Sequence, residues 1–197
     1  MSWRVIVFFL ALGFAGEIAL AADPRLTVTV DPKLLPPGYQ TDSGLYLTAR
    51  EAHRVATTLP RIVVIDVRTH GETLFNGVAT PMHRHIPYVM LDVDQSYDTK
   101  NARYRLEPNP DFVKAVEMLL TEMKLDRTAT LVVYCSVGER SARATNLLAR
   151  SGFTTVYSVA DGFEGEASSK IGPGWKASVL PWSQQLKPQQ AYKSPSM

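Results

Sequence analysis

The stretch that most constrains the fold is residues 131–144, which contain Cys135, the only cysteine of the chain. Residues 131–134 are apolar and partly β-branched, which is typical of a strand covered on both faces. From Ser141 onward, small and apolar residues recur at helical spacing until Gly152, a residue suited to ending a helix. The sequence therefore predicts a buried strand, a short loop that begins with the cysteine, and a helix.

The position of Cys135 in this unit favours a reactive thiol. The carboxyl end of a parallel strand is where open α/β sheets bind their ligands. The cysteine would also face the first turn of the next helix, whose dipole and loop amides favour a thiolate over a thiol. Arg140 adds a positive charge and a fork of donors suited to an oxyanion. The loop thus predicts a nucleophile rather than an inert, buried cysteine.

Three motifs in this chain resemble one family. The loop carries four residues in the order Cys-x-x-Gly-x-Arg-Ser: Cys135, Gly138, Arg140 and Ser141. This order resembles the active loop of rhodanese-like sulfurtransferases. Residues 64–68, with Glu72 four residues on, resemble the Asp-Val-Arg strand end of that family, and residues 152–165 resemble its closing strand and glycine turn. The likeness runs from about residue 45 to residue 182.

The resemblance implies an α/β, rhodanese-like fold, with a central, mainly parallel sheet and helices on both faces. It also implies double displacement at sulfur, in which the Cys135 thiolate attacks the outer sulfur of a donor such as thiosulfate. Sulfite leaves, and the resulting persulfide passes its outer sulfur to a thiol or to cyanide. No cofactor and no metal are expected for this chemistry.

The expected site extends beyond the nucleophile. The loop that would bind the anionic donor comprises Ser136, Val137, Gly138, Glu139, Arg140 and Ser141. Within it, Arg140 would either orient the oxyanion of the donor or hold the loop. Asp66 and Arg68, at the end of the neighbouring strand, are expected to brace this loop rather than to react. Arg68 and Glu72 also stand at helical spacing, which suits an ion pair between them. His83 and His85 alternate in a predicted strand, but no third ligand for a metal is evident.

Glu139 places a negative charge beside the predicted thiolate, and two arrangements are open. Glu139 either points outward and pairs with Arg143 one turn on, or it faces the entrance and disfavours an anionic donor. We expect the entrance position, because Ser136 and Val137 add no positive charge to the rim and leave Arg140 alone.

Two other functions remain open for such a domain. It can serve as a non-enzymatic persulfide carrier or as a protein-binding module. The nearest enzyme alternative is a cysteine-dependent phosphatase of the related fold. That chemistry uses a loop one residue longer than the four residues between Cys135 and Arg140, so we expect sulfur transfer instead.

Residues 1–21 have the pattern of a secretory signal peptide. Arg4 gives a positive start, residues 5–16 are apolar, and residues 19–21 form an Ala-x-Ala cleavage site. The apolar run is too short to span a bilayer. We therefore expect a protein that is exported to the bacterial periplasm and keeps no membrane anchor after cleavage. A periplasmic protein is then a further candidate partner.

The remaining segments flank or interrupt the predicted domain of residues 45–182. Residues 22–44 are rich in proline and predict an extended arm, with one strand at residues 26–30. Residues 92–107 form a long polar insertion that could roof the active loop. Residues 183–197 have the composition of a flexible tail. The net charge of +2 gives no support for nucleic-acid binding.

Two helix starts can be placed from local signals. Thr48 and Glu51 match a capping box, in which each side chain accepts a hydrogen bond from the other residue's backbone amide. Asn109 followed by Pro110 matches an N-cap and a first helical position. The sequence therefore predicts helices that begin just after Thr48 and just after Asn109.

Overall fold

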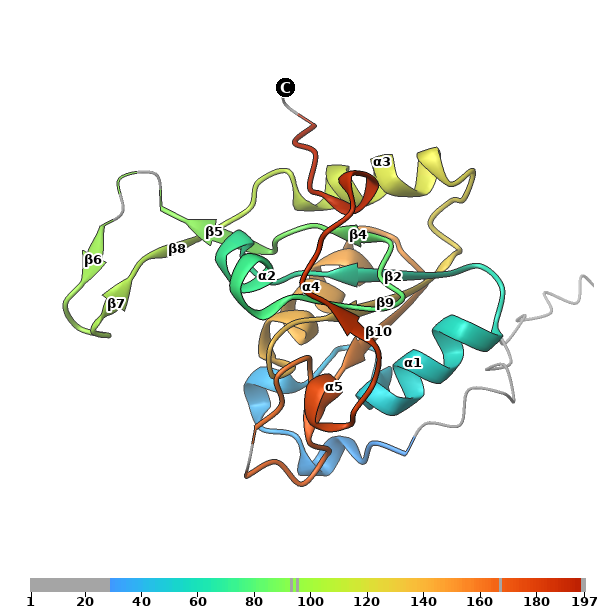
Figure 1. Cartoon of the computed structure of the whole chain (residues 1–197), viewed down its shortest axis with the longest axis horizontal. Helices are drawn as coiled ribbons and strands as arrows, with labels where there is room; N and C mark the ends of the chain where they lie inside the picture. Colours follow the sequence, from blue (N-terminus) through green and yellow to red (C-terminus); the bar gives the residue numbers. More distant parts are fainter. Residues whose placement is uncertain (1–28, 93, 95, 167, 196–197) are drawn as a thin grey trace, which may run out of the picture.

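The structure is a computed structural model that describes residues 29–195 except positions 93, 95 and 167. Five strands form a parallel sheet in the order β1-β10-β9-β2-β4 (Figure 1). In that order they are Tyr46–Leu47, Thr155–Val159, Thr130–Tyr134, Ile62–Asp66 and Arg84–His85. This sheet and its helices confirm the predicted fold class.

Helices cover both faces of the sheet because its central strands are apolar on both sides. In β9, Leu131 and Val133 pack into one hydrophobic core, and Val132 and Tyr134 pack into a second core on the opposite face. Helices α3 and α4 contribute to the first core, and α1 and α5 contribute to the second. Their bounds are Ala49–Thr58 for α1, Phe112–Glu122 for α3, Glu139–Arg150 for α4 and Gly174–Ala177 for α5.

One of the two predicted helix starts is confirmed, and the other is wrong by two residues. Thr48 and Glu51 form the predicted capping box at α1. Helix α3 has Asp111 rather than Asn109 at its N-cap. The Asn109 side chain donates to the Pro87 carbonyl oxygen at 2.9 Å and accepts from the Asp111 amide at 3.0 Å. Asn109 therefore forms a turn that precedes the helix.

Helix α2 (His70–Asn76) begins just after β2 and has a capping box of its own. Thr69 accepts a hydrogen bond from the Glu72 amide, and the Glu72 carboxylate accepts one from the Thr69 amide. Within this helix Thr73 is the buried residue, so no apolar periodicity in the sequence predicts it. Strand β3 (Val78–Ala79) follows α2 and pairs antiparallel with β11 (Trp182–Ser183).

The polar insertion at residues 92–107 lies within a two-stranded ribbon that projects from the body of the domain (Figure 1). At its base β5 (Val89–Leu91) pairs with β8 (Leu106–Pro108), and further out β6 (Tyr97–Asp98) pairs with β7 (Arg103–Tyr104). Described residues of the insertion are thus joined by antiparallel pairing, which the sequence did not predict.

The described part of the arm lies against α4. It contains two short 3-10 helices, η1 (Pro32–Leu34) and η2 (Pro37–Tyr39). The Asp42 amide donates to the Asn146 side chain at 2.7 Å, which ties the arm to α4. Residues 26–28 of the predicted strand lie outside the described residues, and residues 29–30 are not in a strand. The predicted signal peptide also lies outside them, and no helix in the described part of the chain is long and apolar enough to cross a membrane.

The segment after residue 182 contacts the domain over most of its described length. After β11 it contains the 3-10 helix η3 (Pro188–Gln190). The Gln190 side chain donates to the Met82 carbonyl oxygen at 2.5 Å, and the Tyr192 hydroxyl donates to Asn109 Oδ1 at 3.3 Å. These contacts differ from the free tail that the composition of the segment predicts.

Candidate active site

Cys135 lies at the carboxyl edge of the sheet, as its sequence position predicts. It follows β9 directly, and Asp66 at the end of β2 is in register with Tyr134, the last residue of β9. The Gly138 amide donates a hydrogen bond to the Cys135 Sγ at 3.2 Å, and Ser141 Oγ lies 3.7 Å from the sulfur. The side chain has no exposed surface. Among the described residues, Gly138 alone supplies an amide hydrogen bond to the sulfur, whereas the sequence predicts several.

The backbone of the loop is held by the turn that follows β10. The Phe163 amide donates to the Cys135 carbonyl oxygen at 2.8 Å, and the Glu164 amide donates to the Ser136 carbonyl oxygen at 2.9 Å. Gly138 has a φ of +107°, and a Cβ added there would lie 2.2 Å from the Ala160 carbonyl oxygen. A side chain at this position is therefore excluded both by the backbone conformation and by the close approach of the turn.

Ser141 is buried beneath the loop and supports it. Its hydroxyl donates to the Gly138 carbonyl oxygen at 2.9 Å and lies 2.9 Å from the Ser158 hydroxyl on β10. The two hydroxyls and the thiol thus form a small polar cluster below the first turn of α4. Such a cluster favours one geometry for the loop, because a buried hydroxyl without a partner is unfavourable.

Arg140 is bound to the carboxylate of Glu72. Its Nη1 and Nη2 each lie 2.6 Å from a Glu72 carboxylate oxygen, and the Ser136 hydroxyl donates to the same carboxylate at 2.5 Å. Glu72 therefore connects α2 to both ends of the active loop. This arrangement corrects one expectation, because the partner of Glu72 is Arg140 instead of Arg68. Of the two roles open to Arg140, these contacts fit the one in which it holds the loop.

The charges of this pair stabilise each other. Burial by itself would raise the pKa of Glu72, but the hydrogen bonds from Arg140 and Ser136 outweigh it and hold that pKa well below its usual range. Burial by itself would lower the pKa of Arg140, but the Glu72 carboxylate, with a smaller effect of a Cys135 thiolate, raises it. Both groups are charged at neutral pH. The Thr69-x-x-Glu72 pattern was the sequence signal for this residue, because a capping box fixes the start of α2 and with it the position of Glu72.

Asp66 and Arg68 form a fully buried ion pair beside the loop. Arg68 Nη2 lies 2.7 Å from Asp66 Oδ2 and donates to the Gly77 carbonyl oxygen at 2.6 Å. The guanidinium carbon lies 4.1 Å from the centre of the Phe163 ring. Arg68 thus contacts Phe163, whose amide donates to the Cys135 carbonyl oxygen. The ion pair therefore lies where a brace for the loop is expected from the sequence. Burial would lower the pKa of Arg68, but the charge of Asp66 raises it.

Glu139 lies on the surface of α4 and pairs with Arg143, whereas we expected it to face the entrance without this partner. Its Oε1 lies 2.5 Å from Arg143 Nη2, and the two side chains are 41% and 56% exposed. Glu139 is the first residue of the helix, and a partner one turn on is within reach of its side chain. The structure therefore shows the outward arrangement that the sequence left as the alternative.

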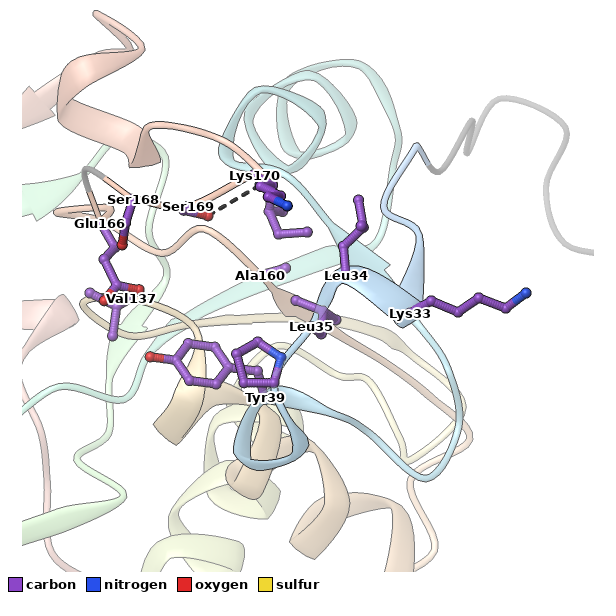
Figure 2. Close-up of a pocket in the computed structure, with 12 residues that line it drawn as sticks. Lys33, Leu34, Leu35, Tyr39, Val137, Ala160, Glu166, Ser168, Ser169 and Lys170 are labelled. Carbon is purple, nitrogen blue, oxygen red and sulfur yellow. Dashed lines mark hydrogen bonds between the residues drawn. The ribbon is translucent and has the colours of Figure 1, made fainter.

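Val137 lines a cavity of about 470 Å³ between the arm and the loop after β10 (Figure 2). Tyr39 from the arm and Glu166 from the opposite loop line the same cavity. In Figure 2 the Tyr39 hydroxyl points toward Val137. Burial raises the pKa of Tyr39, and the negative charges of Glu166 and Glu139 raise it further. The tyrosine is therefore a neutral hydrogen-bond donor at the side of the active loop.

The two histidines considered as metal ligands have other partners. His83 Nδ1 accepts a hydrogen bond from the Val64 amide at 3.0 Å, and His85 Nε2 lies 2.7 Å from the Arg68 carbonyl oxygen. Burial lowers the pKa of both. Over the described residues, no three side chains of His, Cys, Asp or Glu are grouped so as to hold a metal ion.

The site and the fold agree with the comparison to known families. The family model described as a rhodanese-like domain matches residues 49–168, which is more than half of the chain. The chain therefore belongs to the rhodanese-like family.

Individual relatives match only part of this chain. An uncharacterized protein of Rickettsia prowazekii is 35% identical over 77 residues, which make up 39% of this chain and 58% of that protein. Rhodanese-like domain-containing protein 17 of Arabidopsis thaliana is 28% identical over 127 residues, 60% of this chain and 78% of that protein. The match thus spans little more than half the length of the first of these relatives.

One solved structure supports the fold. A thiosulfate sulfurtransferase from Pseudomonas aeruginosa superposes with a TM-score of 0.51 at 14% identity, over 79% of this chain and 23% of that one. At this identity the likeness concerns the fold alone.

Proposed function

We propose that this protein is a sulfurtransferase that carries a sulfane sulfur as a persulfide on Cys135. The observation that carries the proposal is the position of the Cys135 Sγ at the carboxyl edge of the sheet, 3.2 Å from the Gly138 amide at the start of α4. An amide aimed at the sulfur stabilises a thiolate, which is the reacting form of cysteine.

In the first half-reaction the Cys135 thiolate attacks the outer sulfur of a donor such as thiosulfate. The new bond joins Sγ to that sulfur, and the bond to the sulfonate sulfur breaks, so that sulfite leaves with the electron pair. In the second half-reaction a thiolate or cyanide attacks the outer sulfur, and the electron pair of the broken bond returns to Sγ. Neither half-reaction needs a separate oxidant or reductant.

The pairing of Arg140 with Glu72 leads us to propose a modest activity with thiosulfate. A free guanidinium beside the sulfur would attract a doubly charged donor, but here its charge is matched by a carboxylate at 2.6 Å. We therefore expect Arg140 to hold the loop rather than to bind the donor. The same pairing disfavours the phosphatase alternative, because a bound phosphate would need those donors.

The test is mass spectrometry of the intact protein after incubation with thiosulfate. Cys135 is the only cysteine, so a gain of one sulfur atom would locate the persulfide without further mapping. Cys135→Ser is the matched control and should show no gain. Addition of cyanide should remove the sulfur and release one equivalent of thiocyanate. A protein that keeps its original mass with thiosulfate and with polysulfide would refute the proposal.

A second candidate function is favoured by the complete burial of Cys135, which has no exposed surface. In a persulfide carrier the site opens when a partner protein binds, and turnover with small molecules is slow. Loading of Cys135 that is slow with every small donor, yet fast from another protein's persulfide, would support the carrier. Fast loading and unloading with small molecules would support the enzyme.

We also propose that the chain is exported to the bacterial periplasm, on the basis of residues 1–21. The mature protein should begin at Ala22. Expression of the full sequence in a bacterial host, followed by amino-terminal sequencing of the periplasmic fraction, tests this; an uncleaved product in the cytosol would contradict it.

A further inference from the structure

A second cavity lies on the Arg140 side of the active loop, and the projecting ribbon supplies one of its walls. The cavity has a volume of about 480 Å³, within the range of pockets for small organic molecules. From the ribbon, Arg103, Leu106 and Val89 line it, and from α4 it is lined by Arg140 and Arg143. The insertion at residues 92–107 therefore reaches the active loop from the side.

The charges of this cavity leave one arginine unmatched. Arg140 is paired with Glu72, and Arg143 is paired with Glu139. Both of these glutamates also line the cavity. Arg103 is exposed and makes no ion pair with any of the described residues.

Asp98 is the acidic residue closest to Arg103 by strand register, since the two are paired across β6 and β7. Its carboxylate accepts hydrogen bonds from the Asn101 side chain at 2.7 Å and from the Lys100 amide at 3.0 Å. These contacts hold Asp98 at the tip of the ribbon. The positive charge of Arg103 is thus left for a group that enters the cavity.

We propose that this cavity binds the sulfur acceptor, and that the acceptor is a low-molecular-weight thiol that carries a carboxylate. Arg103 binds the carboxylate, since a guanidinium and a carboxylate form paired, charge-assisted hydrogen bonds. Val89 and Leu106 contact the apolar part of the molecule, and its sulfur faces the active loop. The inference rests on the proposed function, because it names the acceptor of the Cys135 persulfide.

The chemical step balances without another reactant. The acceptor thiol loses its proton to solvent, and its thiolate attacks the outer sulfur of the persulfide. A bond forms between these two sulfurs, and the bond from the outer sulfur to the Cys135 Sγ breaks. The electron pair stays on Sγ, which becomes a thiolate again, and the acceptor leaves as its own persulfide. Arg103 takes no part in bond making and is a specificity-determining residue.

The first experiment isolates the second half-reaction. Protein loaded with thiosulfate and freed of excess donor is mixed with 3-mercaptopropionate, 2-mercaptoethanol or cysteamine, which are an anionic, a neutral and a cationic thiol of similar size. Loss of one sulfur from Cys135 is followed by mass spectrometry. Arg103→Gln is compared with Arg105→Gln, a matched control on the same ribbon that does not line the cavity. For each thiol, the rate of sulfur loss in the variant is divided by the rate in the wild type. This ratio removes differences in the intrinsic reactivity of the thiols.

Arg103→Gln should slow the reaction of 3-mercaptopropionate about tenfold, as expected for loss of one charge-assisted hydrogen bond. Its reaction with 2-mercaptoethanol should change less than about twofold, and Arg105→Gln should resemble the wild type. The selective loss should shrink as added salt screens the charge. An equal change in rate for all three thiols, or the same change in rate in both variants, would overturn the acceptor site. Either result would leave the persulfide chemistry intact.

The second experiment does not depend on catalysis. Binding of 3-(methylthio)propionate, which cannot react, is measured by ligand-observed NMR on the unloaded protein. Wild type and Arg105→Gln should bind it more tightly than they bind 2-(methylthio)ethanol, and Arg103→Gln should lose this preference. Equal binding by both variants would overturn the acceptor site even if Cys135 never accepts sulfur. If Cys135 takes up no sulfur but the wild type still binds 3-(methylthio)propionate selectively, only the proposed function would be overturned.

Discussion

Replacement of Glu72 by glutamine removes one negative charge from the group that connects α2 to the active loop and keeps the size of the side chain. Glutamine is also a capping-box residue, so the start of α2 should persist. What is lost is the ion pair with Arg140, whose two contacts of 2.6 Å are both to the carboxylate. Arg140 would then keep its charge in a mostly covered position without a counter-ion.

The expected loss of stability follows from burial. Removing one partner of a fully buried ion pair costs about 3–5 kcal/mol, whereas an exposed pair contributes about 0–1 kcal/mol. The side chains of Arg140 and Glu72 are 21% and 24% exposed. The pair is therefore closer to the fully buried case than to the exposed case. We expect the free energy of unfolding to fall by about 2–3 kcal/mol, which corresponds to a lowering of Tm by about 4–12 °C for a chain of this size.

The pH dependence gives a second signature. The pKa of Glu72 in the folded protein is held well below its usual range, despite the opposing effect of burial. Its contribution is therefore fully present above the unfolded pKa of about 4.3 and is lost as the pH falls below that value. The difference in unfolding free energy between wild type and Glu72→Gln should thus be greatest near neutral pH and should shrink in acid.

Urea denaturation at several pH values measures both effects. Glu139→Gln is the matched control, since it breaks a surface pair with Arg143 and should change the unfolding free energy by less than about 0.5 kcal/mol. A Glu72→Gln protein as stable as this control, or one whose deficit stays constant from neutral to acid pH, would refute the assignment of Glu72 as the charged anchor of the loop.

Three further substitutions test the site. Gly138→Ala should lower the unfolding free energy by about 2 kcal/mol or more and slow persulfide formation, because the added Cβ would lie 2.2 Å from the Ala160 carbonyl oxygen at a φ of +107°; normal stability and loading would contradict the tight loop. Arg68→Met should cost about 3–5 kcal/mol in urea denaturation by leaving the Asp66 carboxylate buried and unpaired, and a loss below about 1 kcal/mol would show that the pair is not needed. Glu139→Gln should leave kcat/KM for thiosulfate within about twofold of the wild-type value at low and high salt. A rise in kcat/KM that disappears at high salt would instead show that the Glu139 charge acts on the donor at the entrance.

Much of the unit around Cys135 could be predicted from short-range signals. The apolar run of β9 can be satisfied only by cover on both faces, and the structure buries Leu131 to Tyr134 completely. Gly152 has a φ of +88° just after α4, as a helix-ending glycine requires. The capping box of Thr48 and Glu51 is likewise written within four consecutive residues. These features depend on neighbours in the sequence, so their residues are sufficient to indicate them.

The partners of the charged residues were decided by the tertiary structure. Glu72 and Arg140 are 68 positions apart, and they meet because β2 and β9 are adjacent and in register and both lead into helices at the same edge of the sheet. No local pattern distinguishes this pair from the rejected pairing of Arg68 with Glu72. The ribbon brings Arg103 to the same edge in the same way, through antiparallel pairing of short strands that carry no strong hydrophobic alternation. A charged side chain on a surface helix has several partners within reach, and the packing of the elements selects among them by distance and burial.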